Sequence, residues 1–369
     1  MTEPRFPAST TSRRDLLSIM ACASIAAGLP KLAQARPAVH DGPAARARDW
    51  DWLAGNWNVR NRRLRQRLAG DTHWDEFAGT SAVWLTMGGL GTVDDNILHL
   101  PAGPYRAAGI RSYDPATDRW SIWWLDGRNP TRIDPPVSGR FDGDAGTFTG
   151  VDMFGGRPIG VRFRWQGIHG RRPHWQQSFS PDGGRTWEMN WENFFTRTAP
   201  TPSPLPLLSP DDASKAPDDW SFLAGRWTVH HRKLRHRLVG SREWDEFGGT
   251  FVNWPLLGGN GNVGDNMMAA PAGAYRGMGL RAFDPARREW LSWFLDGRYP
   301  TRIGEPLRGG FSDGVGTFLS DDVHEGRPIR ARATWSRITR TSARWEQAFS
   351  VDGGQNWEVN WTSDYTRIM

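Results

Sequence analysis

The chain contains two copies of one long segment. Residues 49–197 align with residues 219–367 at a constant offset of 170 and without a gap, and 73 of the 149 aligned positions are identical. Solenoid and propeller units run to about 20–50 residues, so each copy here is expected to be a whole domain. We therefore divide the 369-residue chain into domains at residues 48–197 and 218–369. Between them, residues 198–217 hold six prolines, a density that favours an extended, semi-rigid linker.

Each copy has the pattern of an antiparallel all-β domain. Short runs rich in Trp, Phe, Val and Thr are separated by turn signals, and no ten-residue stretch has helical periodicity. In the first copy the turns are expected at 114–117, 154–158 and 180–184. The expected strands are 56–68, 73–86, 93–100, 105–113, 119–126, 145–153, 158–167, 174–180 and 187–197. Eight to ten strands in a domain of this length predict a closed barrel, which leaves no exposed sheet edge.

Composition excludes several classes of site. The single cysteine, Cys22, rules out an intrachain disulfide and a multi-cysteine zinc site. The net charge is +6, but acidic residues are interspersed with the arginines, so we expect no nucleic-acid partner. None of the nine histidines has a histidine at the 170-residue offset. We therefore expect no metal site and no cofactor.

The first residues have the pattern of an export signal. Arg13 and Arg14 precede an apolar stretch at 16–29, and a small-x-small cleavage pattern follows at 33–35. This predicts a signal peptide at residues 1–35 and an N-terminal segment at 36–47. The arginine pair resembles a twin-arginine signal, with an ordinary secretory signal as the alternative. We expect a soluble periplasmic or secreted protein, with no stable membrane span in the mature chain because no other apolar segment is long enough.

Both copies open with a Gly-x-Trp motif, Gly55-Asn56-Trp57 and Gly225-Arg226-Trp227. This motif, at the start of the first strand, resembles the signature of lipocalins and the wider calycin superfamily. The copies also resemble bacterial lipocalin-like domains of unknown function that end in Ser-x-Asp-Gly-Gly-x-x-Trp. The resemblance implies two tandem lipocalin-like barrels, each a cup for a small, mostly apolar ligand or, occasionally, an enzyme site. It also implies that the motif's tryptophan closes one barrel end beneath an arginine of the last strand, here Arg197 or Arg367.

A carboxylate beside large aromatic side chains recurs near the second strand of each copy. In Trp74-Asp75-Glu76-Phe77, alternation places Trp74 and Glu76 on one face of the strand. The pair is either part of a ligand-facing site or a surface strut paired with arginine. Trp244 and Glu246 are its counterparts in the second copy.

The predicted first strand carries Arg63, Arg65 and Arg67 at every second position, on the same face as Trp57. If that face lines the cavity, these cations suit a carboxylate or phosphate on an apolar body. The alternative is a bulge that turns the neighbouring leucines inward and the arginines outward. Arg65 and its counterpart Arg235 are included among the candidate ligand-binding residues.

A tryptophan-rich strand ends in Asp-Gly-Arg in both copies, a natural place for a polar constellation at a barrel mouth. The alternative is a salt-bridged loop cap. The candidate residues are Trp123, Asp126, Arg128 and Arg132, with Trp293, Asp296, Arg298 and Arg302 in the second copy.

Ser180-Pro181-Asp182-Gly183-Gly184 and the following Trp187 match an Asp-box, which recurs once at 350–357. One box in each domain does not make a propeller. We interpret it as a structural turn, in which the aspartate accepts backbone N–H bonds and the glycines supply positive φ.

The leading functional hypothesis is binding of a small aromatic or amphipathic ligand in tryptophan-lined barrels. The first alternative is a lyase- or isomerase-type enzyme in which Glu76/Glu246 or Asp126/Asp296 act beside an arginine. The second is carbohydrate binding, which predicts exposed, coplanar tryptophans.

Overall fold

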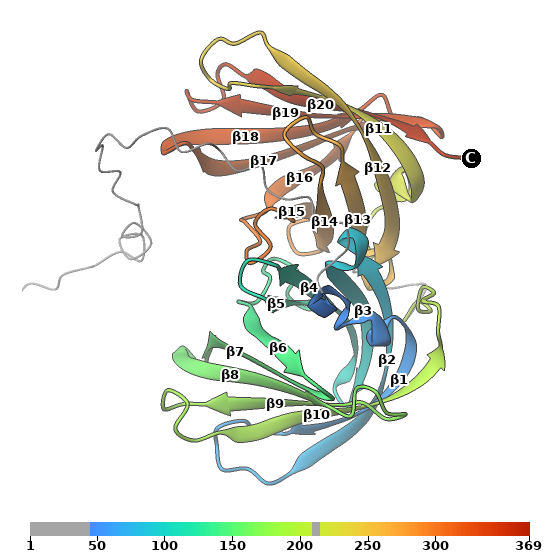
Figure 1. Ribbon diagram of the computed structural model, residues 1–369, viewed down its shortest axis with the longest axis vertical. Coiled ribbons are helices and arrows are strands. Elements are labelled where there is room, and N and C mark those ends of the chain that lie inside the picture. The colour runs from blue at the N-terminus through green and yellow to red at the C-terminus, as the bar shows by residue number, and fades with distance from the viewer. Residues whose placement is uncertain (1–44, 209–214) are drawn as a thin grey trace, which may run out of the picture. The chain divides into compact units, whose positions relative to one another are not determined.

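The computed structural model describes residues 45–208 and 215–369. Within the first copy, each strand pairs antiparallel with the next, and β10 pairs back onto β1 to close a barrel (Figure 1). This barrel 1 consists of β1 (Gly55–Leu64), β2 (Trp74–Thr86), β3 (Gly91–Leu100), β4 (Gly103–Asp114), β5 (Arg119–Asp126), β6 (Val137–Asp142), β7 (Ala145–Phe154), β8 (Arg157–Gln166), β9 (His174–Ser180) and β10 (Glu188–Ala199).

The second copy repeats this topology, with β20 closing onto β11. Barrel 2 consists of β11 (Gly225–Leu234), β12 (Trp244–Leu256), β13 (Gly261–Met268), β14 (Tyr275–Asp284), β15 (Glu289–Asp296), β16 (Leu307–Ser312), β17 (Val315–His324), β18 (Arg327–Ser336), β19 (Ser342–Ser350) and β20 (Glu358–Arg367). The predicted fold class, two tandem antiparallel barrels in an all-β chain, is confirmed.

The nine strands expected in the first copy are all present, two of them (119–126 and 174–180) with the predicted ends and the others with shifted ends, and the structure adds β6. This strand has only six residues and carries Gly139, so its sequence lacks the β-branched and aromatic run that marks a strand. The glycine is required by close packing, because a Cβ at this position would lie 1.9 Å from the carbonyl oxygen of Thr147 on β7. Strand β1 ends at Leu64, four residues before its predicted end.

Alternation along β1 sets the inside and outside of barrel 1. Trp57, Val59 and Asn61 are buried, whereas Asn58 and Arg60 are exposed. Successive side chains of a strand point to opposite faces of the sheet, so the first set faces the barrel interior. The aromatic side chains that meet at one end of this interior include Trp50, Trp57, Trp120, Phe141, Phe148, Trp165 and Phe195.

That end of barrel 1 is closed by the Gly-x-Trp motif. The Trp57 indole donates a hydrogen bond to the Leu53 carbonyl at 2.8 Å, and the Arg197 guanidinium lies 4.1 Å above the indole ring. The same guanidinium donates to the carbonyls of Ala54 and Trp52. In barrel 2, Arg367 lies 4.2 Å above Trp227 and contacts equivalent carbonyls. The cap that the resemblance implied is present in both copies.

The Asp-box forms the turn before β10. Asp182 accepts hydrogen bonds from the Thr186 amide at 2.9 Å and from the hydroxyls of Thr186 and Ser180 at 2.6 and 2.8 Å. Gly183 and Gly184 adopt φ of 74° and 93°, which side chains disfavour. The second box has the same hydrogen bonds around Asp352, in agreement with a structural role.

In the ranges that the structure describes, no helix has the length and apolar character needed to cross a bilayer. The predicted export signal at 1–35 lies outside the described residues.

Candidate functional site

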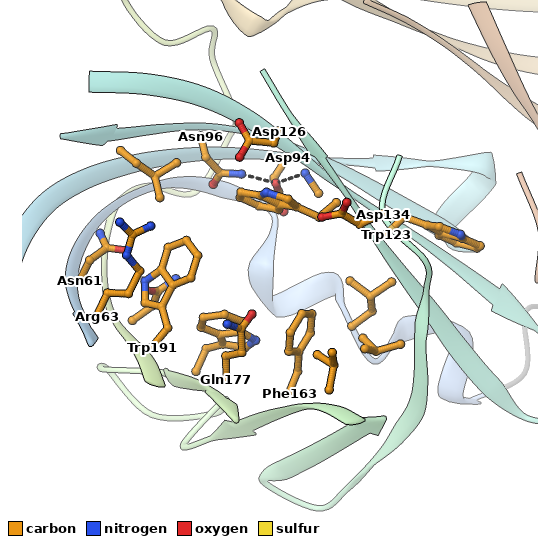
Figure 2. Close-up of a pocket in the computed structure, with 18 of the residues that line it drawn as sticks. Asn61, Arg63, Asp94, Asn96, Trp123, Asp126, Asp134, Phe163, Gln177 and Trp191 are labelled. Atoms are coloured by element: carbon orange, nitrogen blue, oxygen red, sulfur yellow. Dashed lines mark hydrogen bonds between the residues drawn. The ribbon is translucent and has the colours of Figure 1, made fainter. Parts of the chain in front are cut away.

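Barrel 1 encloses a cavity of about 290 Å³ (Figure 2). All ten of its strands contribute lining residues, so the space lies in the barrel interior. Its open end is marked by two lining side chains of β7, Val151 and Met153, which are 68% and 48% exposed. The volume is near the lower limit of small-molecule sites, which run from about 300 to 1,000 Å³.

Most of the cavity wall is apolar and aromatic. Trp175 packs edge-on against Trp191, with ring centroids 5.8 Å apart, and against Phe163 at 5.0 Å. Edge-to-face packing of this kind fixes the ring positions and is worth about 0.5–1.5 kcal/mol per pair. Other apolar lining residues include Val59, Ile97, Leu98, Ile122, Trp124, Val161 and Phe179.

A buried polar cluster interrupts this wall on β3 and β4. Asp94 accepts hydrogen bonds from the Gly109 amide at 2.6 Å and from the Arg111 guanidinium at 2.7 Å. The Asn96 amide also donates to this carboxylate (Figure 2). Asp94 and Arg111 are 3% and 7% exposed, and the guanidinium lies 4.5 Å from the Trp50 ring. The charges of Asp94 and Arg111 are therefore paired with each other inside the barrel wall.

A second group of polar residues lines the cavity at Tyr105. Arg128 lies 3.7 Å from the Tyr105 ring and donates to both carboxylate oxygens of Asp126, at 3.0 and 2.5 Å. Burial raises the pKa of Tyr105 to about 12, partly offset by the charges of Arg128, Arg63 and Arg67. Tyr105 therefore keeps its proton at neutral pH and is a hydrogen-bond donor.

Arg63 and Arg67 line the same cavity. Arg63 lies over the rings of Trp191 and Phe77, at 5.4 and 5.8 Å. Burial lowers the pKa of both arginines, and in Arg67 the nearby charge of Arg63 acts in the same direction. Guanidinium groups stay charged despite such shifts, so this part of the cavity is positively charged.

The structure shows which arginines at the end of the first strand face the cavity and which face outward. Arg63 and Arg67 line the cavity, while Arg65 is exposed and pairs with Asp75 at 2.9 Å. Regular alternation stops because β1 ends at Leu64 and Leu68 takes a positive φ of 56°.

The predicted site residues of barrel 1 fall into two groups. Trp123, Asp126 and Arg128 line the cavity. The lining residues do not include Trp74, Glu76, Arg65 or Arg132.

The second group makes contacts elsewhere. Glu76 pairs with Arg62 at 3.1 Å and Arg60 at 3.6 Å on the barrel surface, beside Trp74, which has Arg62 over its ring at 5.0 Å. Arg132 pairs with Asp134 at 2.9 Å.

Their counterparts in barrel 2 make similar contacts. Glu246 pairs with Arg232, whose guanidinium lies over Trp244, and Arg235 pairs with Asp245. Arg298 pairs with Asp296, Arg302 lies 5.0 Å from the Tyr299 ring, and Trp293 is buried.

The duplicated interior has diverged where the Asp94 cluster lies. The counterpart of Asp94 is Gly264, and Phe251 replaces Ser81. A Cβ on Gly264 would lie 2.3 Å from the Phe251 ring, so this ring occupies the corresponding space. Arg281, the counterpart of Arg111, donates instead to the Asn262 side chain at 2.8 Å.

Sequence reasoning missed Asp94, Arg111 and Gln177 as lining residues. A usable signal was the asymmetry of the repeat. Asp94 aligns with Gly264 in the second copy, whereas Arg111 aligns with another arginine, Arg281. An arginine that both copies share, but whose acidic partner occurs in just one of them, marks a position where the two barrel interiors differ.

Within the described ranges, no cluster of three or more His, Cys, Asp or Glu side chains has an arrangement that suits a metal ion.

No protein-family model and no curated protein matches this chain. Among solved structures, it is similar to an S-type phycobiliprotein lyase from Guillardia theta, with 10% identity, 41% of this chain and 90% of that chain covered, and a TM-score of 0.29. It is also similar to a DUF3598-family protein of unknown function from Nostoc punctiforme, with 10% identity, 88% and 100% coverage, and a TM-score of 0.24. Likenesses at this level carry no information on function.

Proposed function

We propose that barrel 1 binds a small molecule with an aromatic or amphipathic body. The observation that carries this proposal is the cavity of about 290 Å³, whose aromatic wall includes fixed polar groups. Sites for small molecules typically combine a largely apolar lining with a few placed polar side chains. A body of one or two rings matches this volume and the aromatic wall.

Binding is favoured over acid–base catalysis by the contacts of the predicted carboxylates. Glu76 lies on the barrel surface between two arginines, and Asp126 accepts from two guanidinium nitrogens of Arg128, Nε and Nη2. A general base needs a carboxylate free to reach the substrate proton. The contacts of these two side chains favour structural and positioning roles.

The tryptophans do not favour the carbohydrate alternative. All 22 lie in described parts of the chain, and each is buried or half-buried. Sugar stacking needs an accessible indole face, and the edge-on pair of Trp175 and Trp191 presents no coplanar platform.

The test is isothermal titration calorimetry with 2-naphthalenemethanol, a neutral two-ring probe. We expect saturable binding with one molecule per chain. The triple variant S81F/T92N/D94G gives barrel 1 the residues that barrel 2 has at these positions and places a phenyl ring in the cavity. We expect this variant to fold and to lose binding, because barrel 2 shows that the combination is compatible with the barrel.

The matched control is the reverse exchange F251S/N262T/G264D in barrel 2, which should leave the affinity of the barrel 1 cavity unchanged. Absence of saturable binding to the unaltered protein, by this probe and by its carboxylate analogue 2-naphthoate, contradicts the proposal. Equal binding by the folded S81F/T92N/D94G variant contradicts the location in barrel 1.

We also propose that residues 1–35 direct export by a twin-arginine route to the periplasm or beyond. Support comes from the order of the Arg13–Arg14 pair, the apolar stretch and the small-x-small pattern. Fractionation of bacterial cells that produce the protein and its R13K/R14K variant tests this. We expect the variant to stay in the cytoplasm, and unchanged export would exclude the twin-arginine route.

A further inference from the structure

Two arginines of the barrel 1 cavity have no carboxylate partner of their own. No ion pair within 4.0 Å joins Arg63 or Arg67 to an acidic side chain in the described residues, although both are half-buried and line the cavity. Their neighbours are aromatic: Arg67 lies over the rings of Phe154 and Phe179, at 5.0 and 5.6 Å. Ring faces attract cations but do not neutralise them.

The acidic groups whose charges act on these arginines are bound elsewhere. Asp75 accepts from Arg65 at 2.9 Å, and Asp126 is held by Arg128. Glu188 accepts the Leu68 backbone amide at 2.8 and 3.0 Å. Asp75 and Asp126 thus each have an arginine partner outside the pair, and Glu188 is bound by a backbone amide, so Arg63 and Arg67 both lack an ion-pair partner within the described residues.

Tyr105 adds a neutral donor to the same place. Its ring is buried and lines the cavity, and its hydroxyl makes no hydrogen bond with any side chain or backbone group that the structure describes. Arg63 and Arg67 lie close enough for their charges to act on it. A phenol that keeps its proton donates readily to an anionic oxygen.

We propose that Arg63, Arg67 and Tyr105 form an anion subsite in the barrel 1 cavity, which makes the ligand an organic acid with an apolar ring body. The acidic group, a carboxylate, sulfonate or phosphate, accepts from the two guanidiniums and the phenol. The ring body packs against Trp191 and the aromatic wall beyond it. Charge-assisted bonds in a partly desolvated site are about twice as strong as neutral ones, so the anion contributes strongly to selectivity. This inference rests on the proposed ligand-binding function of barrel 1.

The experiment compares three probes with the same ring system: 2-naphthoate, 2-naphthalenemethanol and 2-naphthylmethylammonium. Calorimetric titration of the full chain is expected to give an affinity for the anion about tenfold or more above that for the alcohol, with the weakest binding by the ammonium probe. In the R63Q/R67Q variant, we expect the anion to lose that advantage while the affinity for the alcohol changes less than about twofold.

The control is R60Q, which removes one positive charge from the same strand but outside the cavity lining. It should leave the preference for the anion intact, because Arg60 is exposed and pairs with Glu76, whose charge does not act on Arg63 or Arg67. Y105F is expected to weaken the binding of 2-naphthoate and not that of the other two probes.

The outcomes separate the two proposals. Equal affinities for 2-naphthoate and 2-naphthalenemethanol, or an equal loss of both in R63Q/R67Q, overturn the anion subsite and leave the ligand-binding function standing. If no probe binds the unaltered protein, both proposals are overturned.

Discussion

The Arg111 guanidinium donates a 2.7 Å hydrogen bond to Asp94 inside barrel 1, and both side chains are almost fully shielded from solvent. Barrel 2 keeps the arginine as Arg281, which donates instead to the neutral Asn262 side chain. The two copies therefore differ in the acceptor that they provide for a guanidinium buried inside an aromatic barrel. The ionic acceptor leaves room for a cavity, while the neutral one occurs with the Phe251 ring in the corresponding space.

We predict that D94A destabilises barrel 1 by about 3–5 kcal/mol, because it leaves the Arg111 charge buried without its partner. The variant T92N/D94G supplies the neutral acceptor that barrel 2 uses and should lose markedly less. Guanidinium chloride unfolding followed by tryptophan fluorescence measures both. Equal stability of D94A and the unaltered protein would show that the ion pair contributes nothing.

The cap of barrel 1 gives a second prediction. R197K keeps the positive charge but removes the planar group that lies over Trp57 and donates to two carbonyls. We expect a loss of about 1–2 kcal/mol, seen as a lower thermal midpoint. R140K, a change at an exposed arginine of β6, is the control and should leave the midpoint unchanged. An equal effect of both changes would exclude a special role for the cap.

The burial of His231 predicts that the stability of barrel 2 depends on pH. Burial lowers its pKa to about 4, and the charges of His230 and Lys233 act in the same direction. The unfolded chain binds a proton at this histidine near pH 6.5, before the folded chain does, so stability falls as the pH is lowered from about 6.5 to 4. A shift of this size corresponds to a loss on the order of 3 kcal/mol.

The matched variant is H231N, which introduces the residue that barrel 1 has at this position. Asn61 accepts a hydrogen bond from the Trp191 indole at 3.2 Å, so an asparagine is compatible with the site. The difference in unfolding free energy between pH 6.5 and pH 4 should shrink in H231N. An unchanged pH profile would show that His231 does not titrate as described.

The Asp-box gives a fourth prediction. Hydrogen bonds from Thr186 and Ser180 hold the pKa of Asp182 well below its usual range. The turn should therefore keep its hydrogen bonds as the pH falls through the ordinary range of aspartate, and lose them only in stronger acid.

In D182N we expect faster amide hydrogen exchange at residues 182–187, because the amide side chain replaces only part of the carboxylate's accepting capacity. The intact second box around Asp352 is an internal control in the same molecule. Exchange that stays equal in the two boxes would contradict the assigned role.

The repeat and the local motifs could be interpreted from the sequence because they depend on neighbouring residues. The turn at Asp182 follows from a short motif with one favourable geometry, whereas the cap at Trp57 was implied by the resemblance to lipocalins. Strand β6 could not be found in this way, since its glycine is explained by the approach of β7 and not by its own propensity.

The sequence by itself determined the duplication and the all-β barrels, because periodicity and turn residues act over a few residues, and the resemblance carried by Gly-x-Trp implied the two capped ends. Only the tertiary structure decided which charges face the cavity. Arg63 and Arg67 turn inward and Arg65 outward because β1 ends at Leu64, and a strand end breaks the alternation on which the sequence argument relied. The partnership of Asp94 with Arg111 likewise depends on the register between β3 and β4, which is set by the closure of the barrel.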